Sequence, residues 1–181
     1  GARNRMRARV VSPLWREIRS QNRQRILDSD WDQLIVLDAC HADLFRTYWS
    51  RSETPDIVFS AGSATGEWTR QNFTGRYARG THYLSANPMF DHSLDQMNHD
   101  PFGRREKLWD NPEFWSSELH TVPPSATLGR LVSVAKETDR RVVAHLLQPH
   151  YPFVVGSDET ASIAGDHMEW VRSEGGNPQT N

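Results

Sequence analysis

Short apolar runs separated by polar turns recur along this chain, and they predict strands that alternate with helices. The clearest run covers residues 33–37 and ends on Asp38. A continuous run of branched apolar residues is typical of a strand that is buried on both faces of a parallel sheet. Further strands are predicted over 56–60, 81–85 and 141–147. We therefore expect an α/β fold in which a parallel-type sheet is flanked by helices.

Helical patterns occupy several of the segments between the predicted strands. They cover about 42–49, 67–73 and 124–136. An earlier helix is predicted over 12–27, where Pro stands at the first helical position and apolar residues follow at helical spacing. Its arginines form either a solvated face or a basic surface for a membrane or an acidic partner. Residues 89–123 are rich in Asp, His, Asn, Pro and Trp, which predicts a long irregular insertion that serves as a lid or surface loop.

These patterns divide the chain into three parts: a basic amphipathic helix over 1–29, an α/β domain over 30–155 and a flexible tail over 156–181. The net charge of -2 gives no overall case for nucleic-acid binding. With a single cysteine, the chain cannot form an internal disulfide. No segment approaches the roughly 20 apolar residues of a membrane span, and no signal-peptide core follows the N-terminus. A cytoplasmic protein is therefore expected.

Polar residues with chemical potential stand where predicted strands end. Asp38 ends the first strand, Asn87 follows the strand over 81–85, and His150 follows the strand over 141–147. Ligand sites of α/β proteins lie beyond the carboxyl ends of the strands. An ionised carboxylate beside a hydrophobic strand is costly unless it is paired, and a cation would offset that cost. Two alternatives stay open here: His150 hydrogen-bonds the backbone of its loop, and Asn87 makes an Asx turn.

Ser63 and Thr65 lie in a tight polar turn before a predicted helix. The N–H groups and the dipole at a helix N-terminus favour an anion such as phosphate or sulfate. A hydroxyl group in that place could attack a phosphorus or sulfur centre if a metal ion lowered its pKa. The alternative interpretation is that Thr65 is an ordinary N-cap.

Four segments together resemble the sulfatase-like branch of the alkaline phosphatase superfamily. Residues 65–77 resemble the nucleophile helix of that superfamily, which ends in Thr-Gly-x-Tyr as this segment does. Residues 37–45 are similar to the first strand and its metal-binding Asp, and residues 62–68 to a Gly-Ser-x-Thr-x-Glu-Trp turn. Residues 145–153 are similar to a segment with the pattern Pro-His-x-Pro. The resemblance covers about residues 30–155.

This resemblance implies a metal-dependent hydrolase of sulfate or phosphate esters. Asp38 would hold a divalent cation, which could be zinc, calcium, magnesium or manganese, and Thr65 would be the nucleophile. His150, Asn87 and Ser63 would contact the substrate.

Two departures from the family pattern limit what the resemblance implies. His41 stands where the family has Arg, and the second metal cluster, an Asp-His pair after a late strand, is missing. Asp166-His167 comes too early along the chain to replace it. One carboxylate is too few, because even catalytic zinc takes about three protein ligands.

We therefore expect an incomplete alkaline phosphatase-like fold, in a chain that is a fragment, a degenerate copy or the partner of a second chain that supplies the missing ligands. The alternative function is a non-catalytic domain that binds an anionic ligand or a partner.

Overall fold

The computed structural model of the protein describes most of the predicted α/β region. The described residues are 26, 29–56, 58, 60–62, 64–73, 76–97, 100–156 and 161–163. Nearly all of the predicted N-terminal helix lies outside them, and so do Ser63 and Asp166-His167. In the described part of the chain, no helix has the length and apolar character needed to cross a membrane.

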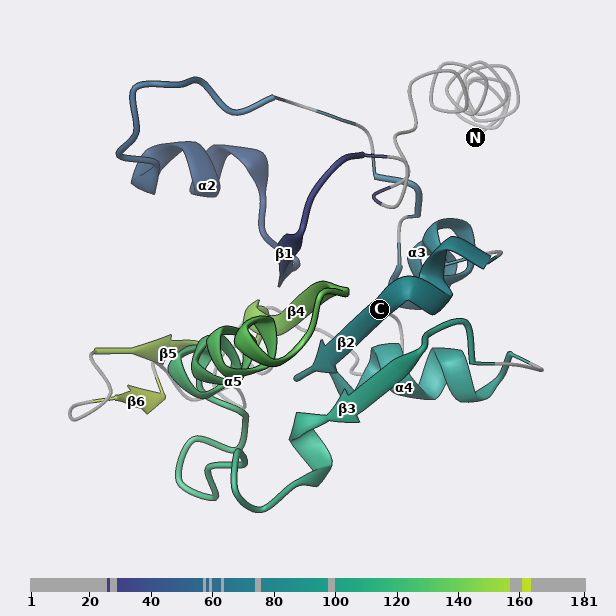
Figure 1. Ribbon diagram of the computed structural model, residues 1–181. Helices are drawn as coiled ribbons and strands as arrows, with labels where there is room; N and C mark the ends of the chain where they lie inside the picture. Colours follow the sequence, from purple (N-terminus) through teal and green to yellow (C-terminus); the bar gives the residue numbers. More distant parts are fainter. Residues whose placement is uncertain are drawn as a thin grey trace, which may run out of the picture.

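Four parallel strands form the central sheet, in the order β1-β4-β2-β3 (Figure 1). Their bounds are Gln33–Asp38 for β1, Thr81–Ser85 for β2, Arg104–Lys107 for β3 and Arg141–Pro149 for β4. The long strand β4 is central, since its Val143 lies between Leu34 of β1 and Tyr83 of β2. The predicted α/β class with a parallel sheet is confirmed, and all carboxyl ends of the strands point to one edge.

Helices and turns connect these strands. Within the described residues, the α-helices are α2 (Ala42–Tyr48), α3 (Thr65–Asn72), α4 (Pro88–Asp95) and α5 (Pro124–Glu137). The same part of the chain contains the short 3₁₀ helices η2 (Arg76–Gly80) and η3 (Leu108–Asp110). After β4, the short strands β5 (Val154–Val155) and β6 (Ser162–Ile163) pair in an antiparallel hairpin.

Alternating side chains of the central strands feed two separate cores. Tyr83 and Val143 point to one face, where α3 and α4 add aromatic rings. Leu84 and Ala144 point to the other face, which is aliphatic and covered by α5 (Figure 1). The aromatic core consists of Phe73, Ala78, Tyr83, Phe90, Leu94, Phe102 and Val143. The sheet is therefore sandwiched between helices in three layers.

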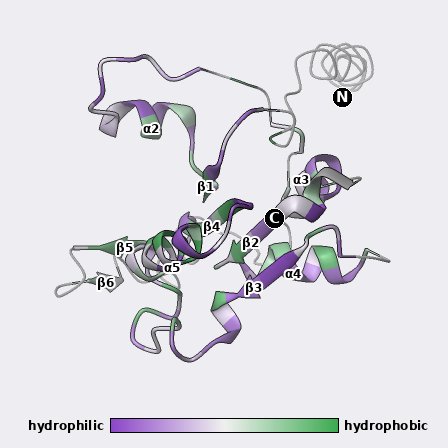
Figure 2. Cartoon of the chain, viewed as in Figure 1, coloured by the Kyte–Doolittle hydropathy of each residue, from purple (hydrophilic) through white to green (hydrophobic). Residues whose placement is uncertain are grey.

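The prediction of an irregular insertion over 89–123 is wrong at its beginning, because both α4 and β3 lie there. Strand β3 has the sequence Arg-Arg-Glu-Lys and is hydrophilic throughout (Figure 2), so no apolar pattern marks it. It forms because its charges are paired. Arg105 binds the buried Asp91 at 2.8 Å, and Glu106 accepts from Arg130 at 2.8 Å. A charged strand is also well suited to a sheet edge.

The interpretation of residues 33–38 as a strand buried on both faces is also wrong. Strand β1 is the opposite edge of the sheet, and the side chain of Ile35 is 50% exposed. An apolar run indicates only that a strand can lie in nonpolar surroundings. It does not indicate whether another part of the chain covers each of its faces.

The strand predicted over 56–60 is absent at its described residues, Asp56, Val58 and Ser60.

Candidate functional site

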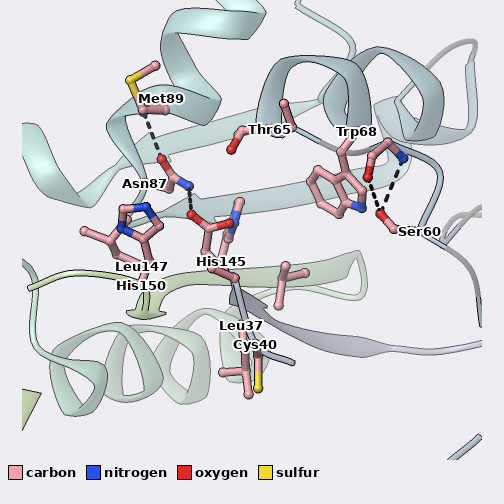
Figure 3. Close-up of a pocket in the computed structure, with 15 residues that line it drawn as sticks. Leu37, Cys40, Ser60, Thr65, Trp68, Asn87, Met89, His145, Leu147 and His150 are labelled. Atoms are coloured by element: carbon pink, nitrogen blue, oxygen red, sulfur yellow. Dashed lines mark hydrogen bonds between the residues drawn. The ribbon is translucent and has the colours of Figure 1, made fainter. Parts of the chain in front are cut away.

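A cavity of about 450 Å³ opens where the carboxyl ends of β1 and β4 meet the start of α3 (Figure 3). It is bordered by polar side chains from five separate parts of the chain, namely Asp38, Ser60, Thr65, Asn87, His145 and His150. Trp68, Met89 and Leu147 add apolar surface. Four of the five residues predicted for the site thus line one cavity. The fifth, Ser63, lies outside the described residues.

Asp38 supplies the carboxylate of the cavity. Its Oδ2 accepts a hydrogen bond of 2.9 Å from Nδ2 of Asn87. Burial raises the pKa of Asp38, and the nearby His150, the backbone N–H of Ala39 and Asn87 offset part of that rise. Ala39 has a φ of 56°, in the left-handed region that is unfavourable for a residue with a Cβ. The backbone is therefore strained at the end of β1, at the residue that directly follows Asp38.

Asn87 connects the carboxylate to the neighbouring helix. As the N-cap of α4, its Oδ1 accepts from the backbone N–H groups of Met89 at 2.9 Å and Phe90 at 3.2 Å. This is the Asx turn that was the alternative prediction for Asn87. Because the oxygen is occupied by the helix, the amide presents its NH₂ group to the cavity and to Asp38.

Thr65 is the first residue of α3, and the N-cap is Ala64, which makes no side-chain cap. Thr65 is therefore not the N-cap, and its hydroxyl makes no hydrogen bond to any described residue. The first N–H groups of a helix lack intrahelical partners and can receive an anion. Gly62 allows this helix start to lie against the preceding loop, since a Cβ there would come within 2.3 Å of the backbone nitrogen of Trp68.

His150 is exposed at the rim of the cavity. Its Nδ1 lies 2.9 Å from the carbonyl oxygen of Tyr151, an acceptor, so Nδ1 carries a proton and donates. His150 therefore makes the backbone hydrogen bond that was its alternative prediction. The same side chain still borders the cavity, so the two roles do not exclude each other.

His145 belongs to the cavity as well, although sequence patterns did not single it out as a site residue. It is a polar residue inside the apolar strand β4, and only 2% of it is exposed. Figure 3 shows it on the cavity wall with Trp68 and Asn87. A histidine in the middle of a buried strand was the signal that could have pointed to it, because such a polar group needs a partner.

The described residues do not make a complete site for a divalent cation. They contain no group of three or more His, Cys, Asp or Glu side chains arranged to hold a metal ion. One oxygen of Asp38 already accepts from an amide NH₂, a group that cannot act as a ligand. Asp38 could contribute one ligand, and the others would have to come from outside the described part of the chain.

Comparisons with known proteins do not add an assignment. No protein-family model matches the chain, and searches of curated proteins and of solved structures give no match either.

Proposed function

We propose that this chain carries the nucleophile and the first metal ligand of a metal-dependent hydrolase of sulfate or phosphate esters. The observation that carries the proposal is that Asp38 and Thr65 line one cavity, although they come from different elements. In this proposal the oxygen of Thr65 forms a bond to the sulfur or phosphorus atom, and its proton passes to the substrate alcohol as that alcohol leaves. Water then hydrolyses the ester on Thr65, which restores the hydroxyl and releases sulfate or phosphate. The incoming anion lies at the uncapped N-terminus of α3, where the helix N–H groups stabilise its charge.

The charges around the cavity support the requirement for a cation. Its described lining includes no lysine or arginine, while Asp38 is acidic. A sulfate or phosphate ester would therefore meet a carboxylate without a fixed positive side chain, which is unfavourable. A divalent cation, which could be zinc, calcium, magnesium or manganese, would link the two negative groups. Since Asp38 is the one ligand identified, we expect the isolated chain to bind an oxyanion but to show little or no turnover.

A second candidate function is non-catalytic recognition of an anionic ligand or partner. It is favoured by the missing ligand set in the described part of the chain. The two functions differ in what they require of Asp38. The hydrolase needs its carboxylate to hold the cation, whereas simple anion binding is better without that negative charge.

Calorimetric titration of the chain with sulfate and with phosphate, each with and without Mn²⁺, Mg²⁺, Ca²⁺ or Zn²⁺, tests the proposal. We expect cation-dependent binding that Asp38→Asn weakens by about tenfold or more, through loss of a charged contact. Thr65→Ala removes the proposed nucleophile, and Thr65→Ser is its matched control because it keeps the hydroxyl. Hydrolysis of aryl sulfate and aryl phosphate esters is measured in parallel.

Three outcomes are informative. Cation-independent binding that improves in Asp38→Asn would favour the recognition function. No binding of either anion under any condition would contradict both functions. Strong turnover that Thr65→Ala abolishes and Thr65→Ser retains would support the hydrolase and contradict the expectation that the chain is incomplete.

A further inference from the structure

His145 is enclosed by aromatic rings at the inner wall of the cavity. Its ring centroid lies 5.6 Å from that of Trp68, 5.3 Å from that of Phe90 and 6.0 Å from that of Tyr83. This packing holds the imidazole in one orientation, because its neighbours belong to α3, α4 and β2. The proposed attack by Thr65 does not use it. A buried polar ring that lines a cavity therefore needs a separate explanation.

The hydroxyl of Tyr83 determines where the imidazole carries its proton. Oη of Tyr83 lies 2.9 Å from Nδ1 of His145, and Tyr83 is completely buried. Burial, together with the charges of Asp91 and Asp38, raises the pKa of Tyr83 well above its usual range, so the hydroxyl keeps its proton. A buried O–H group needs an acceptor, and Nδ1 is the acceptor that the described residues offer. Tyr83 therefore donates to Nδ1, which leaves the ring proton on Nε2.

The other ring nitrogen, Nε2, is available to a ligand. No described residue hydrogen-bonds to it. It is also not completely enclosed, since the fully buried polar atoms without a partner belong to Thr81, Thr127 and Gln148. Burial lowers the pKa of His145 to about 3, so the ring is neutral at ordinary pH. The imidazole thus presents one N–H group and no charge. Since its ring is fixed by packing, binding through this group costs little conformational entropy.

We infer that His145 is a further ligand-contacting residue, whose Nε2–H donates a hydrogen bond to an oxygen of the sulfate or phosphate group in the cavity. Tyr83 is then a positioning residue, which keeps the ring proton on the nitrogen that faces the ligand. This inference rests on the proposed function, because it takes the ligand to be an oxyanion. The imidazole of His145 would be a neutral hydrogen-bond donor in a cavity whose described lining lacks lysine and arginine.

A pair of substitutions separates contact with the ligand from support of the fold. The amide nitrogen of Gln reaches about the position of Nε2, whereas that of Asn reaches about the position of Nδ1. We expect His145→Asn and His145→Phe to weaken sulfate binding about ten- to a hundredfold, the range of one hydrogen bond to a charged group. His145→Gln should stay within about threefold of the unaltered chain, because it restores the donor. Isothermal titration with sulfate and the best cation measures these affinities.

The position of the ring proton gives a readout that needs no variant of His145. Long-range ¹H–¹⁵N correlation spectra of the full chain distinguish a protonated from a bare ring nitrogen. We expect the proton on Nε2 in the unaltered chain and a mixture of the two tautomers in Tyr83→Phe. Added sulfate should shift the Nε2 resonance more than the Nδ1 resonance.

The possible results separate this inference from the function on which it rests. Sulfate binding that survives unchanged in His145→Asn and His145→Phe would overturn this inference alone. A ring proton on Nδ1 in the unaltered chain would do the same, even if the variants fail to fold. Failure of the unaltered chain to bind sulfate with any cation would overturn both. Weaker binding in His145→Asn together with retained binding in His145→Gln supports the inference.

Discussion

The two walls of the cavity differ in how firmly the rest of the molecule supports them. Behind Thr65 and Asn87 lies the aromatic core, in which Phe73 and Phe90 are fully buried. The opposite wall is made by the end of β1, where Val36 and Leu37 are only partly buried. The helix that follows it, α2, has no comparable support in the described part of the chain. Helix α2 contains no buried residue, and the apolar side chain of Leu44 is 43% exposed. One wall is therefore preformed, while the other leaves apolar surface uncovered.

This difference matters because the acidic group of the site comes from the weaker wall. Asp38 ends the edge strand β1, and Asn87 of the firmer wall donates to its carboxylate. Asn87 is completely buried and is itself held by α4. The stronger wall thus orients the functional group of the weaker one. The same geometry explains how a carboxylate from a strand at the edge of the sheet keeps a defined place in the cavity.

The largest expected contrast comes from making the same substitution in the aromatic core and in α2. Leu94→Ala, in the aromatic core behind Thr65 and Asn87, should lower the free energy of unfolding by about 2–5 kcal/mol. Leu44→Ala, on the exposed face of α2, should change it by about 0.5 kcal/mol or less. Urea unfolding followed by circular dichroism measures both. Similar losses in the two variants would contradict the difference in support between the aromatic core and α2.

A smaller effect is expected where the walls meet, at Asn87. Asn87→Ala removes an N-cap and the donor to Asp38, and should cost about 1–2 kcal/mol of unfolding free energy. Asn87→Asp keeps the cap acceptor but sets a second carboxylate against Asp38. Its loss at pH 7 should therefore shrink at pH 4, where the two groups can share a proton. A loss in Asn87→Asp that does not depend on pH would show that the contact with Asp38 is unimportant.

The smallest effect expected is a pH dependence that originates in the firmer wall. The pKa of His145 is about 3 in the folded protein, against an ordinary value of 6.5. Between these values the unfolded chain binds more protons than the folded one, so stability falls as the pH falls. Near pH 5 to 6 the loss should be about 1 kcal/mol per pH unit.

Unfolding of the unaltered chain and of His145→Gln at pH 6 and pH 5 isolates this contribution from those of other groups. The variant should lack that part of the slope, because Gln does not titrate. Equal slopes in the two proteins would mean that His145 is not buried as a neutral ring.

Much of the site could be predicted because its residues stand at recognisable points of the chain. Asp38 ends an apolar run, Thr65 begins a helix, and Asn87 and His150 follow strands. Parallel strands bring such positions to one edge of a sheet. Strand β3 could not be predicted, since its charged residues form a strand only when partners such as Asp91 and Arg130 are in place. Neither that pairing nor the edge position of β1 leaves a local pattern.

By itself, the sequence determined the α/β class and the points where chemistry could occur. The spacing of apolar residues and the alternation of strands with helices are local properties of the chain. Only the tertiary structure decided which of these points meet and which partners they find. Tyr83 and His145 are 62 residues apart, and their hydrogen bond exists because β2 and β4 pair side by side. The tautomer of a buried imidazole depends on such a neighbour, and the pairing of strands determines that neighbour.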